Sequence, residues 1–216
     1  MRGERRQALL KIGTELFSRQ GYKDVSIADI ARGAGVGTGS FYTYFAGKEE
    51  FYGEILDGIE EQGRQEVDRL VASFESPLNR LKAVYRFTTL GVRRNRLLLG
   101  ILTGDKKYAY PGLAARRERG DTLRTHIEET MGRILEEGGR ALELRLGVFR
   151  DPRRLALALF DAILLQMETE KIDELLDDAL HLLERGLARR LRLRAGRERR
   201  EQRRQGLTRQ KSTRSK

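Results

Sequence analysis

The stretch VSIADIARGAGVGTGSFYTYFAGKEEF, residues 25–51, carries two short helix-like segments that glycines separate. Ser26 can cap the first segment, and Asp29 stands three residues later as its capping-box partner. The second segment is predicted to be a short helix over 38–44, and apolar spacing predicts a longer helix over 4–20. Two short helices joined by a tight glycine-containing turn, behind a longer helix, form a helix-turn-helix.

The second short helix combines small and hydroxyl-bearing residues where a surface helix usually carries charge. Phe41 and Phe45 stand four residues apart, so we expect both rings to face the interior. A helix that enters the major groove of DNA needs small residues for close approach and hydrogen-bonding groups for phosphates and base edges. The predicted DNA contacts are Ser26, Thr38, Gly39, Ser40, Tyr42, Thr43, Tyr44 and Lys48. The alternative interpretation is a three-helix bundle with surface tyrosines.

The chain has 216 residues and a net charge of +11, and the excess lies at one end. Residues 189–216 hold 13 Lys or Arg and two Glu, so residues 1–188 are neutral overall. The net charge therefore says little about DNA binding by the folded part. Cysteine is absent, which excludes disulfides and thiolate metal sites, and no apolar run approaches the roughly 20 residues that cross a bilayer. Since the first residues do not look like a signal peptide, we expect a cytoplasmic protein.

Apolar residues recur at helical spacing along the rest of the chain, which predicts an all-α fold. We expect helices over 48–74, from 77 with a possible continuation to 102, over 113–137, from 152 through 167, and over 172–191. Residues 141–149 alternate like a strand but have no predicted partner, so we interpret them as an extended connection. Beyond residue 194 almost nothing could be buried, which favours disorder.

Residues 16–51, LFSRQGYKDVSIADIARGAGVGTGSFYTYFAGKEEF, strongly resemble the tetracycline-repressor (TetR) family of bacterial transcription regulators. The residues that carry the resemblance are Phe17, Gly21, Tyr22, Ser26, Ile27, Ile30, Ala31, Ala34, Gly35, Val36, Gly39, Tyr42, Tyr44, Phe45, Lys48 and Glu49. The chain departs from the family pattern at Gly37 and Gly47, where serine caps are common, and at Thr38, where lysine is frequent. The operator sequence can therefore not be taken from relatives.

The resemblance implies a three-helix DNA-binding head over 1–50 and a larger helical domain over 51–194 that binds an effector and dimerises. Residues 195–216 remain as a basic tail that we expect to be disordered. The resemblance also implies a homodimer that binds double-stranded DNA at a palindromic operator, with the last helix pair forming the dimer's four-helix bundle. We expect a repressor that a small molecule releases, with no catalytic residue, no metal, no cofactor and no membrane partner.

The sequence does not identify the effector. Polar and apolar residues mix at helical spacing at Tyr85, Thr88, His126, Thr130 and Met131, which either line a pocket or belong to an ordinary core. Basic residues cluster at Arg93, Arg94, Arg96, Lys106 and Lys107, which either attract an anionic or acyl-type effector or form a solvated face. Glycines at 53, 58 and 63 either let the helix over 48–74 bend or allow a neighbouring helix to pack closely.

Two other classes of protein compete with this interpretation. An architectural DNA-binding protein would have the same head but no effector. A helical-bundle metalloenzyme would need several inward carboxylates and two histidines, and Asp178-x-x-His181 with the acidic pairs at 128–129 and 136–137 is the only hint of such a site. Nucleophilic catalysis lacks support because no Gly-x-Ser-x-Gly motif occurs.

Overall fold

The computed structural model describes residues 2–118, 120, 122–166 and 171–187. Within these ranges every regular element is helical, which confirms the predicted all-α class. In chain order the elements are α1 (Arg2–Gln20), α2 (Ile27–Gly33), α3 (Thr38–Tyr42), α4 (Lys48–Ala72), α5 (Pro77–Phe87), the π-helical turn η1 (Thr88–Val92), α6 (Arg96–Thr103), α7 (Leu113–Glu118), α8 (Leu123–Arg140), the 3-10 turn η2 (Leu146–Val148), α9 (Pro152–Leu165) and α10 (Ile172–Leu187).

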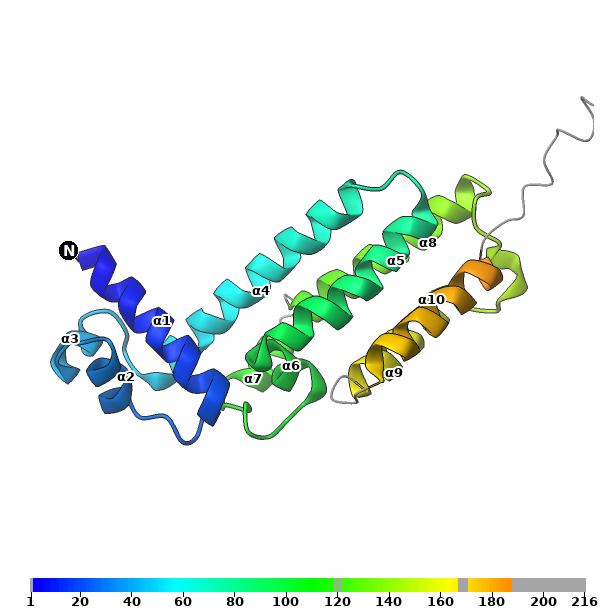
Figure 1. Ribbon diagram of the computed structural model, residues 1–216. Helices are drawn as coiled ribbons and strands as arrows, with labels where there is room; N and C mark the ends of the chain where they lie inside the picture. The colour runs from blue at the N-terminus through cyan, green and yellow to red at the C-terminus, as the bar shows by residue number, and fades with distance from the viewer. Residues whose placement is uncertain (1, 119, 121, 167–170, 188–216) are drawn as a thin grey trace, which may run out of the picture.

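The molecule is elongated, with α1, α2 and α3 at one end and the other helices in a bundle (Figure 1). The long helix α4 starts beside the three-helix head and runs into the bundle, where it packs against α5 and α8. Helices α9 and α10 pack against each other and complete the bundle, α10 against α5 and α9 against α8. Helix α4 therefore belongs to both the head and the bundle.

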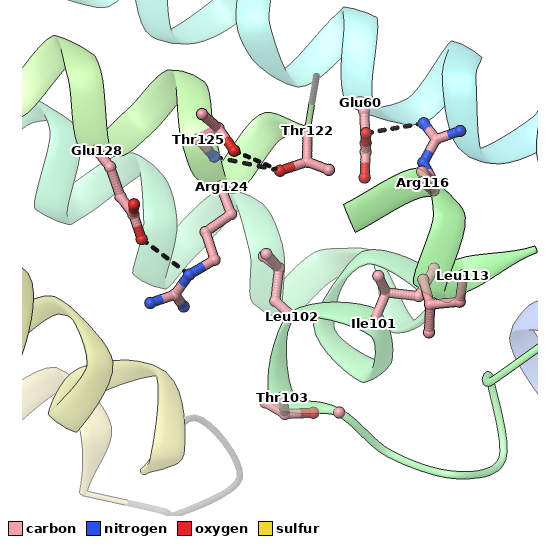
Figure 2. Close-up of a pocket in the computed structure, with 11 residues that line it drawn as sticks. Glu60, Ile101, Leu102, Thr103, Leu113, Arg116, Thr122, Arg124, Thr125 and Glu128 are labelled. Carbon is pink, nitrogen blue, oxygen red and sulfur yellow. Dashed lines mark hydrogen bonds and ion pairs between the residues drawn. The ribbon is translucent and has the colours of Figure 1, made fainter. Parts of the chain in front are cut away.

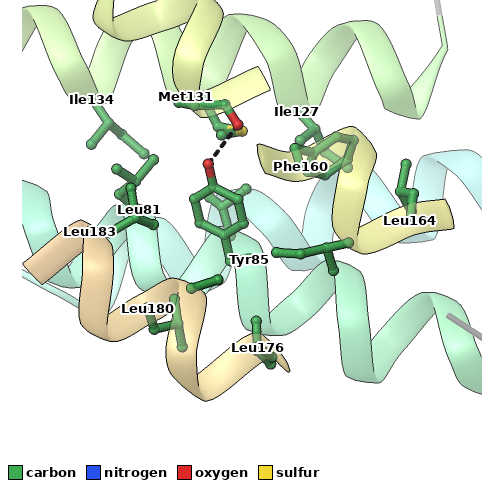
Figure 3. Packing of buried hydrophobic residues seen from close by; sticks show 14 of the residues in the cluster. Leu81, Tyr85, Ile127, Met131, Ile134, Phe160, Leu164, Leu176, Leu180 and Leu183 are labelled. Carbon is green, nitrogen blue, oxygen red and sulfur yellow. Dashed lines mark hydrogen bonds between the residues drawn. The ribbon is translucent and has the colours of Figure 1, made fainter. Parts of the chain in front are cut away.

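Two hydrophobic cores follow this division. The bundle core gathers around Tyr85, Met131 and Phe160, from three different helices (Figure 3). The head core contains the expected apolar residues of α1, α2 and α3, together with the first turns of α4. It also takes in Ile101 and Tyr108, from the end of α6 and the segment after it. The head is thus packed on part of the C-terminal region rather than joined to it by α4 alone.

The predicted continuation of the helix that begins at residue 77 as far as residue 102 is wrong. Helix α5 gives way to η1, where the hydroxyls of Thr88 and Thr89 donate to the carbonyls of Val84 and Tyr85, four residues back. Such bonds to the backbone compete with the regular helix ladder and bend helices. Asn95 then leaves the helical region, and its side chain accepts from the amide of Leu98 to start α6.

The single helix predicted over 113–137 is also wrong, because α7 and α8 are separate. Gly120 lies between them with a φ of 70°, a left-handed conformation that favours glycine. Thr122 then caps α8 by accepting from the amide of Thr125 at 3.2 Å. The connection over 141–149 has no strand, as expected, but contains η2. The predictions for residues 167, 188–191 and 195–216 fall outside the described residues.

Candidate DNA-binding surface and ligand cavity

The start of α2 forms as its sequence indicates. Ser26 is extended, and its hydroxyl oxygen accepts from the amide of Asp29 at 3.1 Å. The same hydroxyl donates to the Asp29 carboxylate, which holds the pKa of that carboxyl below its ordinary value. Gly35 makes the turn after α2 with a φ of 67°, and Gly37 precedes α3 without a side-chain cap. The turn thus sets α3 against α2, as a helix-turn-helix requires.

Helix α3 is held by aromatic rings on one side and open to solvent on the other. The rings of Phe41 and Phe45 are buried against Phe51 of α4, with centroids 5.1 Å and 4.6 Å from the Phe51 ring. The Tyr42 side chain points away and is 56% exposed. A Cβ added at Gly39 would meet no heavy atom within 4 Å, so this glycine is not there for packing inside the protein. Both features leave room for a large partner to approach the helix backbone.

The remaining predicted contact residues lie on the same end of the molecule. Thr38 and Thr43 are exposed, while Ser40 and Tyr44 are half-buried. The Thr43 hydroxyl donates to the carbonyl of Gly39 at 3.3 Å, so its oxygen can still accept a second hydrogen bond.

Lys48 is turned toward the protein, which sequence reasoning did not indicate. Its ammonium group donates to the carbonyls of Val25 at 2.8 Å and Lys23 at 3.3 Å, and lies 4.5 Å from the centroid of the Tyr22 ring. Desolvation by burial lowers the pKa of Lys48 below its ordinary value. The side chain therefore braces the loop before α2 against the first turn of α4.

A cavity of about 500 Å³ lies farther along the molecule, between α4, α6, α7 and α8 (Figure 2). The lining residues are Glu60, Ile101, Leu102, Thr103, Gly104, Leu113, Arg116, Thr122, Arg124, Thr125 and Glu128. Its volume falls within the range of roughly 300–1,000 Å³ that is common for ligand pockets. Leu113 and Arg116 of α7 and Thr122 at the start of α8 line one side of it, so the separation of α7 from α8, which the sequence did not reveal, shapes the cavity.

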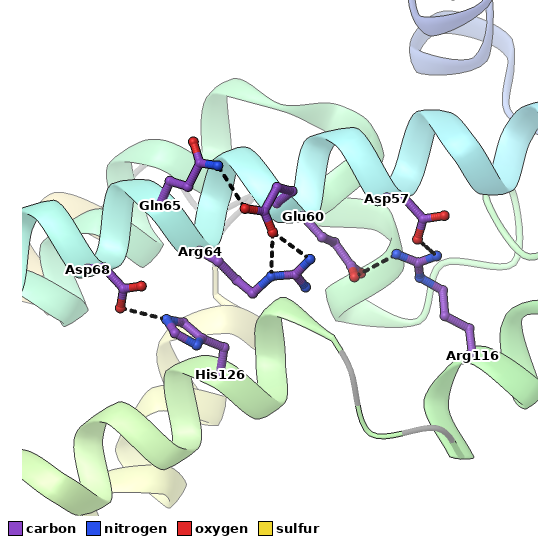
Figure 4. A network of polar contacts seen from close by, with 8 residues as sticks. Asp57, Glu60, Arg64, Gln65, Asp68, Arg116 and His126 are labelled. Carbon is purple, nitrogen blue, oxygen red and sulfur yellow. Dashed lines mark hydrogen bonds and ion pairs between the residues drawn. The ribbon is translucent and has the colours of Figure 1, made fainter.

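Charged pairs hold the walls of this cavity. Arg116 is buried on α7, and its guanidinium donates to Glu60 at 2.8 Å and to Asp57, both on α4 (Figure 4). Burial alone would lower the pKa of Arg116, but the hydrogen bonds and charges of Glu60 and then Asp57 raise it above its ordinary value. On α8, the Nε of Arg124 lies 2.9 Å from Glu128, and its Nη2 donates to Asp161 of α9 at 2.6 Å.

The head also matches known proteins in sequence. The sequence model of the tetR family of bacterial regulatory proteins fits residues 9–55. Residues 9–55 therefore match the N-terminal domain of the tetR family. The predicted family resemblance is therefore confirmed.

Individual relatives share the head and less of the rest. The HTH-type transcriptional regulator HbdR of Aromatoleum sp. (strain CIB) is 37% identical over 78 residues, which are 36% of this chain and 34% of HbdR. The HTH-type transcriptional repressor KstR2 of Mycobacterium tuberculosis (strain ATCC 25618 / H37Rv) is 36% identical over 81 residues, 38% of this chain and 40% of KstR2. The matches thus span only about a third to two-fifths of these relatives' length.

Solved structures extend the likeness to the whole fold. The reduced form of E. coli NemR superposes with a TM-score of 0.66 at 22% identity, over 85% of this chain and 97% of NemR. The transcriptional regulator FadR of Bacillus subtilis, solved in complex with stearoyl-CoA, superposes with a TM-score of 0.61 at 17% identity, over 82% of this chain and 96% of FadR. At these identities the likeness establishes the arrangement of helices in this chain and nothing about its ligand.

The five residues predicted to line an effector pocket are not among those that line the cavity. Tyr85, Thr88, Thr130 and Met131 are buried in the bundle, and the Tyr85 hydroxyl donates to the carbonyl of Ala156 at 2.6 Å. The His126 ring lies at the α4–α8 contact, where its Nε2 is 2.9 Å from Asp68 (Figure 4). A polar residue on an apolar stripe did not distinguish the core from a pocket.

Among the described residues, no three His, Asp or Glu side chains gather closely enough to hold a metal ion. None of the helices in those ranges is both long and apolar enough to cross a membrane.

Proposed function

We propose that this protein is a DNA-binding transcriptional regulator, a repressor that a small molecule releases from its operator. The observation that carries the proposal is the two-sided character of α3. Phe41 on the helix and Phe45 just after it anchor α3 in the head core, while an exposed tyrosine and an open glycine face outward. A helix that enters the major groove needs such an open face, with hydrogen-bonding groups for phosphates and base edges.

The proposed DNA contacts are the residues predicted from the sequence: Ser26, Thr38, Gly39, Ser40, Tyr42, Thr43, Tyr44 and Lys48. Hydroxyls of α3 would donate to phosphate oxygens and reach base edges. Lys48 already donates to two carbonyls, so we expect it to act mainly by fixing the loop at Ser26, with its charge adding attraction to phosphate. Because the target is chromosomal DNA, we propose that the protein works in the cytoplasm.

A homodimer is the second part of the proposal. Helix α9 leaves a row of apolar residues exposed three or four positions apart, namely Leu155, Ala158, Ala162 and Leu165. Helix α10 adds Leu175 and Leu182, the latter 68% exposed. Two copies joined through these helices in a four-helix bundle would cover the rows and present two heads. A twofold dimer reads a palindrome whose half-sites lie about 34–36 Å apart, or a multiple of that distance.

The last part of the proposal assigns a role to each domain. Residues 1–50 bind DNA, residues 51–194 bind the effector and dimerise, and residues 195–216 form a basic tail. We place the effector in the cavity between α4 and α8. A ligand that binds better to the conformation with the wrong spacing of heads must weaken operator binding by the same factor.

Selection of operators from random double-stranded DNA tests this function directly. The proposal expects an enriched palindrome, bound by two copies of the chain in a mobility-shift or sedimentation experiment. A metabolite screen on that complex should then find a compound that releases the DNA. An architectural DNA-binding protein would instead show weak sequence preference and no releasing compound, and absence of any DNA binding would refute both.

A further inference from the structure

The lining of the cavity is more polar than a lipid-binding pocket would be. Only Ile101, Leu102 and Leu113 offer aliphatic surface among the lining residues. Threonines at 103, 122 and 125 and two ion pairs make up most of the rest. A fatty acyl chain in this space would cover charged groups without replacing their hydration, which is costly. We therefore expect the occupant to make hydrogen bonds as well as apolar contacts.

The charges of the lining cancel and are arranged in two places. Glu60 and Arg116 form one pair at the α4–α7 side, and Arg124 and Glu128 form the other on α8 (Figure 2). Asp57 and Asp161 pair with the same two arginines from outside the lining, so the surroundings do not favour a multiply charged anion. A ligand with one positive and one negative group, spaced by a short chain, matches both places at once.

Arg116 supplies an independent sign that an acceptor is missing. Its side chain is 5% exposed, and its Nε makes no hydrogen bond to the described residues, although both terminal nitrogens are paired. Buried donors of this kind nearly always have a partner. Nε is screened from solvent, so a ligand carboxylate reaches it only when the guanidinium turns toward the cavity. That turn would sacrifice the bond to Asp57, which is 67% exposed, more readily than the bond to buried Glu60.

We propose that the cavity binds a compact zwitterion whose carboxylate accepts from Arg116 and whose ammonium group pairs with Glu128. The proposal rests on the proposed function, because it names the chemical class of that regulator's effector. Carboxylate–guanidinium hydrogen bonds are roughly twice as strong as neutral ones, which favours a zwitterion over a polyol. Since Asp57 and Glu60 lie on α4, the ligand would also loosen or shift the helix that enters the head.

Thermal-shift measurements on the full chain test the ligand class. The probes are ω-amino acids from 4-aminobutyrate to 8-aminooctanoate, the twenty protein amino acids, and Gly-Gly and Ala-Ala as dipeptides. Single-charge analogues of the same lengths, butyrate to octanoate and butylamine to octylamine, serve as matched controls, with glycerol and palmitoyl-CoA for the rival classes. We expect at least one zwitterion to raise the Tm in a saturable way while its single-charge analogues do not. Equal or greater stabilisation by hexanoate, glycerol or palmitoyl-CoA, or no response to any zwitterion, overturns the inference.

Two glutamates of α8 provide matched variants. Glu128 and Glu136 each pair with an arginine four residues away on the same helix, but only Glu128 lines the cavity. Glu128→Gln should raise the zwitterion concentration at half-saturation by tenfold or more, and Glu136→Gln should leave it unchanged. Thr125→Val, a milder change in the same wall, should weaken binding several-fold. Equal effects of the two glutamine variants would contradict the assignment.

Operator binding by the ligand-free chain separates this inference from the proposed function. If the chain selects a palindrome but ignores every zwitterion, only the ligand class fails. If it binds a zwitterion in the cavity and no DNA, the proposed function fails while the ligand site stands.

Discussion

The hydroxyl of Tyr52 donates a hydrogen bond of 3.0 Å to the backbone carbonyl of Tyr108, and both residues are buried. This bond joins the first turns of α4 to the segment between α6 and α7, two helices that line the cavity. Two further bonds tie that segment to the end of α1: the Tyr108 hydroxyl donates to the carbonyl of Ser18 at 3.1 Å, and the amide of Tyr22 donates to the carbonyl of Lys107 at 2.9 Å. The head is thus fastened to the wall of the cavity at a second place besides α4.

Tyr52→Phe tests this fastening. The change keeps the ring but leaves the Tyr108 carbonyl without its buried donor, so we expect the free energy of unfolding to fall by about 1–2 kcal/mol. Urea denaturation of the full chain measures it. Tyr44→Phe is the matched control in the same head, because the half-buried Tyr44 hydroxyl makes no hydrogen bond to the described residues. Equal losses in the two variants would show that the Tyr52 bond adds nothing.

Two glycines of α4 should respond in opposite directions to alanine. A Cβ at Gly58 meets nothing within 4 Å, so Gly58→Ala should raise the free energy of unfolding by about 0.5–1 kcal/mol through helix propensity. A Cβ at Gly63 would lie 2.6 Å from Cδ2 of the buried Leu123, so Gly63→Ala should lower it by about 1–2 kcal/mol. Chemical denaturation of both variants decides between bending and close packing at residue 63. A higher free energy of unfolding in both variants would contradict close packing at Gly63.

The same Gly58→Ala variant tests the bending hypothesis at the other glycine. If a flexible α4 transmits the effector signal, the variant should bind operator normally but release it less completely when ligand is added. Unchanged release would leave propensity as the sole effect of this residue.

Tyr42→Phe should weaken operator binding without affecting the fold. The side chain is 56% exposed, so loss of the hydroxyl should leave the Tm unchanged. Removal of one hydrogen bond to phosphate should raise the Kd about tenfold, across good and poor operators alike. Fluorescence anisotropy at fixed salt measures the Kd for good and poor operators, and thermal unfolding measures the Tm. Undiminished affinity would remove Tyr42 from the DNA contacts.

Leu182→Lys should break the proposed dimer. The leucine is 68% exposed in the single chain, so a lysine costs the isolated fold little but would be buried between two copies. Sedimentation should show a monomer whose far-UV circular dichroism matches that of the parent. Phe74→Lys, an exposed apolar residue after the end of α4, is the control and should leave the dimer intact. A dimeric Leu182→Lys protein would place the interface elsewhere.

The contact of α5 with α10 should weaken in acid. Lys82 donates to Glu184 at 2.8 Å, and this hydrogen bond holds the pKa of the Glu184 carboxyl below its ordinary value. Because the folded pKa is below the unfolded one, the stabilisation is present at neutral pH and is lost as pH falls through the folded pKa. Glu184→Gln should therefore reduce stability at pH 7 and flatten its acid dependence, measured by thermal unfolding from pH 7 to pH 3. Glu174→Gln, exposed on the same helix, should keep the parent's slope.

Local signals determined the head of this protein. Ser26 with Asp29, the glycines at 35 and 37, and the spacing of Phe41 and Phe45 each act within a few residues, so the sequence alone predicted the helix-turn-helix and which rings face inward. The family resemblance rested on the same segment.

Only the tertiary structure decided the rest. Lys48 turns inward because the carbonyls of Lys23 and Val25 and the ring of Tyr22 surround its ammonium group. None of these three residues lies near Lys48 in the sequence. The cavity arises where α7 and α8 separate, and Arg116 finds Glu60 more than fifty residues away. Helical periodicity reports which face of a helix is apolar, but it does not say whether a partner helix fills the facing space. For this reason the sequence did not show that Tyr85 and Met131 lie in the bundle core, or that Arg116 and Arg124 line the cavity.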